Sequence, residues 1–125
     1  MRKTGLFMEL LATYRKHGWE LRGALLQPAT QSELQTEEAE LLKNVSVREA
    51  AVDALWFSRP SHNKREAWEL RLVTQTPYAL FETFEEDETE EERQDVKLEM
   101  EARMRDYASE RSPNTKPSTD YADSV

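Results

Sequence analysis

Three charged residues on two adjoining segments have the types and spacing of a metal-dependent hydrolytic site. Asp53 lies near the start of a segment predicted to be a strand, and Glu69 and Arg71 lie two positions apart on the next predicted strand. Side chains at such positions can share one side of a hairpin. Two carboxylates there would hold Mg²⁺ and activate a water molecule. This pattern defines the alternative interpretation of the chain, a divergent metal-dependent hydrolase or nuclease-like domain with catalytic residues Asp53, Glu69 and Arg71.

An acid on one strand followed by acid-x-base on the next superficially resembles the metal site of PD-(D/E)xK nucleases. In that family the base is a Lys that assists the attacking water. Here the base is Arg71, which keeps its proton at ordinary pH. No Pro-Asp pair precedes Asp53, and a further strand is predicted where the family core has a helix. The leading interpretation therefore assigns no catalytic residue.

Other catalytic patterns have the wrong spacing or lack key residue types. Asp53, Ser58 and His62 have the residue types of a nucleophilic triad, but they lie within ten residues of one hairpin and without a nucleophile elbow. The chain has two His and no Cys, so we expect no metal site. Its three glycines fit neither a phosphate loop nor a dinucleotide fingerprint. We expect a non-enzymatic protein without a cofactor.

The tetrapeptide Trp-Glu-Leu-Arg occurs twice, at residues 19–22 and 68–71. In a strand, the Trp and Leu of each copy would point to one face of the sheet and the Glu and Arg to the other. We therefore expect a sheet with one apolar and one charged face. On the charged face, the Glu and Arg side chains of both copies would form a ladder of paired charges.

Hydrophobic periodicity and capping signals predict three helices and about four strands. The predicted helices cover residues 4–17 and 33–43 and a third segment that starts near Thr89. The predicted strands cover residues 19–27, a segment from Val52, residues 66–75 and residues 78–85, whereas residues 45–52 fit either a helix or a strand. Short turns join the last three strands, which predicts an antiparallel meander.

These elements indicate an α+β two-layer sandwich in the order α-β-α-β-β-β-α. Its mostly antiparallel sheet would have helices at the N-terminus, in the first crossover and at the C-terminus. Residues 1–108 are expected to form this single domain, and the Ser-, Pro- and Thr-containing residues 109–125 a disordered tail. The pattern does not determine where the first strand enters the sheet.

The net charge of −8 is concentrated in one segment. Residues 82–101 contain eleven acidic and two basic residues, a net charge of −9, which leaves +1 for the rest of the chain. A nucleic-acid partner is not expected, because such proteins carry a basic face. No signal peptide or membrane-spanning segment is predicted, and the lack of Cys favours the cytoplasm.

Aromatic residues on both faces of the predicted meander favour an interaction role. Trp56 and Phe57 are adjacent, so one of them must point away from the main helical layer and would form an interface if no helix covers it. Next to them, the turn between two strands is basic. The candidate contact surface therefore comprises Trp56, Phe57, Arg59, His62, Lys64 and Arg65. We expect a small protein-interaction domain that binds another protein or a second copy of itself; neither the partner nor the biological role follows from the sequence.

Overall fold

The computed structural model describes residues 3–111, with side chains to Ser109. The elements in chain order are α1 (Lys3–Lys16), β1 (Glu20–Leu26), α2 (Pro28–Glu37), the 3-10 helix η1 (Ala39–Leu42), β2 (Ser46–Glu49), β3 (Ala54–Pro60), the 3-10 helix η2 (His62–Lys64), β4 (Glu66–Leu72), β5 (Ala79–Phe84) and α3 (Glu90–Arg111). Of the tail predicted from residue 109, residues 109–111 belong to α3, and residues 112–125 lie outside the described part of the chain.

The α+β class and the order of helices and strands are confirmed. The sheet has five strands in the order β2-β1-β3-β4-β5. Strands β3, β4 and β5 form the predicted antiparallel meander. The ambiguous segment 45–52 supplies the fifth strand, β2, which pairs in parallel with β1, and β1 pairs antiparallel with β3.

Helix α2 begins five residues earlier than predicted. Pro28 occupies the first turn after an extended Gln27, a position where the missing N–H of proline is harmless and its fixed φ suits the helix. Ser32 and Gln35, whose capping-box spacing favours a helix start at residue 33, therefore lie inside the helix. In contrast, the capping box that opens α3 is present: Thr89 and Glu92 exchange hydrogen bonds between side chain and backbone at 2.9 and 3.1 Å.

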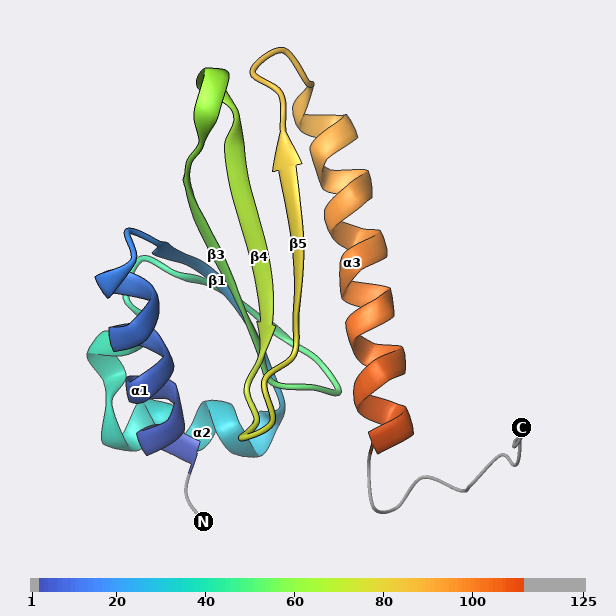
Figure 1. Ribbon diagram of the computed structural model, residues 1–125. Helices are drawn as coiled ribbons and strands as arrows, with labels where there is room; N and C mark the ends of the chain where they lie inside the picture. Colours follow the sequence, from blue (N-terminus) through green and yellow to red (C-terminus); the bar gives the residue numbers. More distant parts are fainter. Residues whose placement is uncertain (1–2, 112–125) are drawn as a thin grey trace.

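Helices cover both faces of the sheet. Phe7, Leu10 and Leu11 of α1 share one hydrophobic cluster with Leu55 and Phe57 of β3, and Leu34 of α2 belongs to the same cluster. On the other face, Met100 and Met104 of α3 pack against Trp56, Leu70 and their neighbours. Figure 1 shows α1 and α2 beside β1 and β3, and α3 running along β4 and β5. The sandwich therefore has three layers where two were expected. Helices α1 and α2 form one layer, the sheet forms the middle layer, and α3 forms the layer on the other side.

The two Trp-Glu-Leu-Arg copies face opposite sides of the sheet, so the expected common charged face is wrong. Leu21 pairs with Phe57 and therefore points to the α1 side, with Trp19. Trp68 pairs with Ser58 and points to the α3 side, with Leu70. Because neighbouring residues of a strand alternate between faces, a one-residue difference in register reverses the whole motif. The Glu and Arg side chains of the two copies therefore lie on opposite faces and form no common ladder.

The contact between α3 and the sheet can be tested by comparing two positions on that helix. Met104 is fully buried and Leu98 is 46% exposed. We expect Met104→Ala to lower the free energy of unfolding by about 2–5 kcal/mol because it opens a cavity in the core. The control Leu98→Ala should change it by only about 0.5 kcal/mol. Chemical denaturation followed by circular dichroism measures both, and equal losses would contradict this packing.

Candidate functional site

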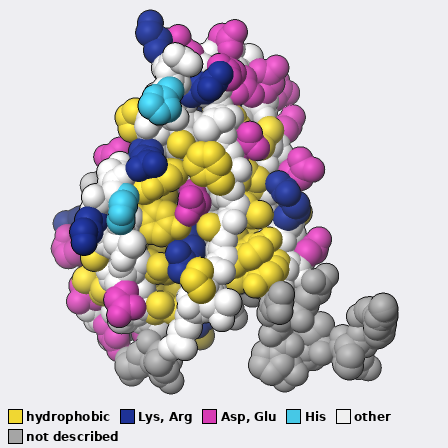
Figure 2. Space-filling view, viewed as in Figure 1, with side chains coloured by type: hydrophobic (Ala, Val, Ile, Leu, Met, Phe, Trp, Pro, Cys, Tyr) yellow, Lys and Arg dark blue, Asp and Glu magenta, His cyan; other side chains and the backbone are white. Residues whose placement is uncertain are grey.

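One half of the sheet on the α1 side is left without a helix. The β3–β4 hairpin extends beyond the end of α1 (Figure 1). We call the surface formed there by Arg59, Glu69, Arg71, Ala79 and Phe81 the open face; it lies on β3, β4 and β5. Figure 2 shows hydrophobic side chains gathered between α1 and α3, around an acidic and a basic group. Among the described residues, this is where the sheet itself meets solvent with apolar side chains.

Phe81 is the main apolar group of the open face. It is 58% exposed, more than any other large hydrophobic residue of the described chain. Its ring stands edge-to-face on Trp19, with 6.4 Å between ring centroids. The guanidinium of Arg59 lies 4.6 Å from the centroid of the Trp19 ring, within cation–π range. Phe81 therefore projects from a buried aromatic base that holds it in place.

Tyr14 and Glu69 form a polar contact at the edge of this aromatic group. Tyr14 stacks on Phe57 with 4.0 Å between centroids, and its hydroxyl donates a hydrogen bond to Glu69. Burial and this hydrogen bond raise the pKa of Tyr14 from 10.0 to about 12, against the opposing effect of Arg71. Tyr14 is thus a hydrogen-bond donor at every physiological pH and unsuited to act as a base.

Asp53 is a buried structural carboxylate. It is 2% exposed and lies just before β3. It accepts hydrogen bonds from the backbone N–H of Gln27 and the hydroxyl of Thr30, both at 2.8 Å, and pairs with the ammonium group of Lys3. Buried charges need such partners. Asp53 therefore ties α1 and the start of α2 to the central strand.

The structure does not bring Asp53 together with Glu69. Both point to the α1 side, but Glu69 pairs with Phe57, four residue steps from Asp53 along the strand, or about 13 Å. Within residues 3–111, no group of three or more His, Cys, Asp or Glu side chains could hold a metal ion. Each carboxylate instead has its own partner on α1, Lys3 for Asp53 and Tyr14 for Glu69.

Ser58 and His62 are also apart from Asp53. Ser58 accepts a hydrogen bond from Arg22 on the α3 side of the sheet, whereas Asp53 points to the α1 side. His62 begins η2 at the tip of the β3–β4 hairpin. The other histidine, His17, contacts the carbonyl oxygen of Thr13 at the end of α1.

Part of the predicted contact surface is buried. Trp56 is 5% and Phe57 0% exposed, because α3 covers the first and α1 the second. They point to opposite faces as expected, but neither can contact a partner. The remaining four residues, Arg59, His62, Lys64 and Arg65, are exposed on the β3–β4 hairpin.

Sequence reasoning missed the central residues of the open face. The alternation of a strand predicts that Ala79 and Phe81 share one side, as the structure shows, but their exposure depends on where α1 ends in space. Tyr14 fits the apolar stripe of α1, and its polar partner Glu69 lies 55 residues away in the chain. No local signal in the sequence marks that contact.

Comparison with protein-family models, with curated proteins and with solved structures finds no match. None of the helices described is both long and apolar enough to cross a membrane. Any function must therefore be inferred from the surfaces of this chain.

Because the pKa of Tyr14 is raised in the folded protein, we expect the stability of the fold to fall at alkaline pH. In the unfolded chain Tyr14 releases its proton near pH 10.0, and in the folded protein only near 12. Its contribution to stability is therefore complete below pH 10.0 and is lost as the pH rises toward 12. Denaturation midpoints across this range should show a fall that disappears in Tyr14→Phe and persists in the control Tyr78→Phe. An unchanged fall in Tyr14→Phe would contradict the assignment.

Proposed function

We propose that this chain is a small non-enzymatic interaction domain that self-associates through its open face and the adjoining edge of β5. The observation that carries the proposal is the exposure of Phe81 on an edge strand, at 58%. Contiguous apolar surface beside a half-covered sheet is typical of interfaces. Burying one Phe side chain contributes about 1.5–3 kcal/mol, and a two-fold symmetric contact would bury two.

The position of β5 favours a second copy of the chain as the partner. β5 is the last strand in the sheet order, so its outer edge pairs with no strand of residues 3–111. Unpaired backbone groups on such an edge are a template for strand addition. Two β5 strands can pair antiparallel about a two-fold axis, the commonest symmetry of soluble oligomers. That pairing would bring Phe81 of each copy close to the same interface.

The charges of the surface are compatible with self-association. The open face carries Arg59 and Arg71 together with Glu69, so two copies meet with mixed charges. The acidic Glu85 and Glu86 follow the C-terminal end of β5. In an antiparallel pair this acidic end would lie beside the N-terminal end of the partner strand, and the two acidic ends would stay apart.

Substitution of Phe81 separates this proposal from nonspecific hydrophobic association. Wild-type protein should sediment with a mass that rises toward the dimer as concentration increases. Phe81→Ser should weaken self-association about tenfold or more, because the apolar contact is lost from both copies. Leu98→Ser is the matched control, since Leu98 is also an exposed apolar residue, at 46%, but lies on α3.

A monomer at every concentration would overturn the proposal, as would equal weakening by the two Ser variants. The net charge of −8 supports a protein rather than a nucleic-acid partner. The cytoplasm stays the location predicted from the cysteine-free composition.

A further inference from the structure

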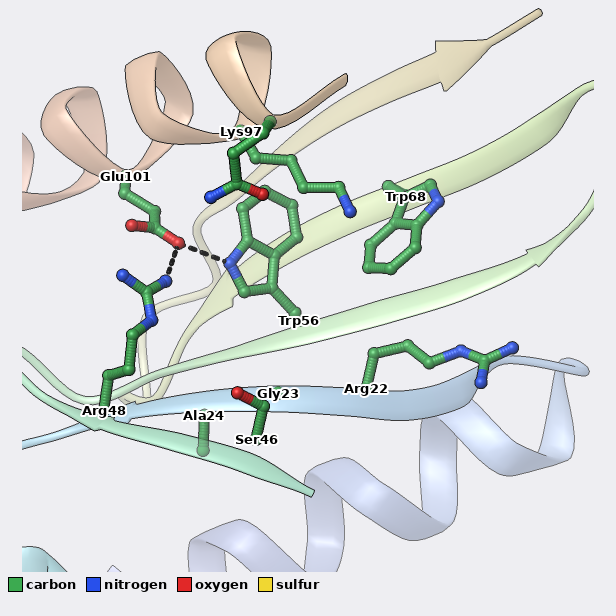
Figure 3. Close-up of a pocket in the computed structure, with 10 residues that line it drawn as sticks. Arg22, Gly23, Ala24, Ser46, Arg48, Trp56, Trp68, Lys97 and Glu101 are labelled. Carbon is green, nitrogen blue, oxygen red and sulfur yellow. Dashed lines mark hydrogen bonds and ion pairs between the residues drawn. The ribbon is translucent and has the colours of Figure 1, made fainter. Parts of the chain in front are cut away.

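A pocket lies on the opposite side of the sheet from the open face, between α3 and the strands β1 and β2 (Figure 3). It has a volume of about 260 Å³ and is lined in part by Arg22, Gly23, Arg48, Trp68 and Lys97. It shares no lining residue with the open face. An inference about this pocket is therefore independent of the proposed self-association.

An irregularity in β1 shapes the floor of the pocket. The register between β1 and β3 shifts between Leu21 and Gly23, which is the signature of a β-bulge. A bulge changes the direction of a side chain, here that of Arg22. A Cβ at Gly23 would lie 3.3 Å from the carbonyl oxygen of Ser46 and 3.8 Å from Trp56. Glycine therefore keeps the floor open beside Arg22.

The basic side chains come from three separate elements: Arg22 from β1, Arg48 from β2 and Lys97 from α3. Arg22 is held by hydrogen bonds to Ser58 at 2.8 Å and to Glu20 at 2.9 Å. Such anchoring limits the rotamers of a long side chain before any ligand arrives.

Arg48 is fixed by a buried carboxylate. Glu101 is 3% exposed and accepts hydrogen bonds from Arg48 and, at 2.8 Å, from the indole Nε1 of Trp56. Figure 3 shows these contacts at one end of the pocket. Arg48 therefore compensates the charge of Glu101, the buried carboxylate at this end of the pocket.

Lys97 is the basic group of the pocket that no acidic side chain of the described residues contacts directly. It makes no hydrogen bond or ion pair with the described residues, and its ammonium group lies 3.5 Å from the centroid of the Trp68 ring. Partial burial lowers its pKa against the raising effect of Glu90 and Glu66. A half-buried cation that faces a hollow is better stabilised when an anion enters.

We propose that this pocket binds a small multivalent anion, an organic carboxylate or a phosphate, through Lys97 and Arg22 with Arg48 at its inner end. Arg and Lys donors suit both kinds of acidic oxygen. The volume of about 260 Å³ admits a small metabolite and excludes a folded partner. The segment that supplies Lys97, residues 82–101, carries eleven acids. Basic groups gathered in the pocket are therefore not a general property of the surrounding surface.

Titration of the isotope-labelled full chain with inorganic phosphate and, separately, with citrate tests the proposal at constant ionic strength. The three indole N–H signals report on the two faces of the sheet. Trp56 and Trp68 line the pocket, whereas Trp19 packs on the α1 side. We expect saturable shifts at Trp56, Trp68 and Gly23 with one or both anions and no shift at Trp19. The anion that binds with the lower dissociation constant shows whether the pocket prefers a phosphate or a carboxylate.

Variants on two elements make the result specific. Lys97→Gln and Arg22→Gln should each weaken binding about tenfold, and Lys97→Arg should keep it within about twofold, because it retains the charge. Lys43→Gln is the control, since Lys43 is exposed and pairs with Glu40 outside the pocket. If Lys97→Gln disturbs folding, as seen in its thermal midpoint, Arg22→Gln alone decides.

Three results would overturn the proposal. The first is the absence of saturable shifts with both anions. The second is an equal shift at all three indoles, which would indicate a general ionic effect. The third is binding that Arg22→Gln leaves unchanged or that Lys43→Gln weakens as much.

Discussion

The central strand β3 is buried on both of its faces, and the other layers follow from that constraint. Every residue from Ala54 to Ser58 is buried, with Phe57 toward α1 and Trp56 toward α3. A strand that is apolar on both sides needs cover on both sides. The short α1 and α2 cover one side only over β1 and over β3 as far as Phe57, whereas α3, with 22 residues, runs along the other side. The open face is the part of the sheet that this unequal cover leaves exposed.

Polar contacts at its two ends set the limit of the α1 layer. At one end, the buried carboxylate of Asp53 holds Lys3 of α1 and Thr30 of α2. At the other end, Tyr14 reaches Glu69 and Arg59 donates to the carbonyl oxygen of His17. It costs free energy to leave a buried charge or hydrogen-bonding group without its partner. The contacts at these two points therefore fix the helix against the sheet. The carboxylates considered for metal chemistry thus have structural partners, and the exposed aromatic surface begins where these partners end.

The sequence predicted the elements whose signals are local. The apolar stripe of α1, the Thr89 capping box and the short turns of the meander all lie within a few residues, and all are present. What depends on pairing between distant segments was not predictable. The parallel addition of β2, the opposite directions of the two Trp-Glu-Leu-Arg copies and the exposure of Phe81 depend on register and on where α1 ends. The same reason hid the basic pocket, since Arg22, Arg48 and Lys97 approach one another only after the sheet and α3 pack.

The two edges of the sheet provide the most direct test of self-association at the open face. β5 and β2 are both edge strands, but only β5 adjoins the open face. Amide hydrogen exchange should be measured at low and at high protein concentration. The account predicts that some amides of residues 79–84 exchange more slowly at high concentration, while those of residues 46–49 do not change. Equal exchange of β5 at both concentrations, in a sample that sedimentation shows to be associated, would contradict it.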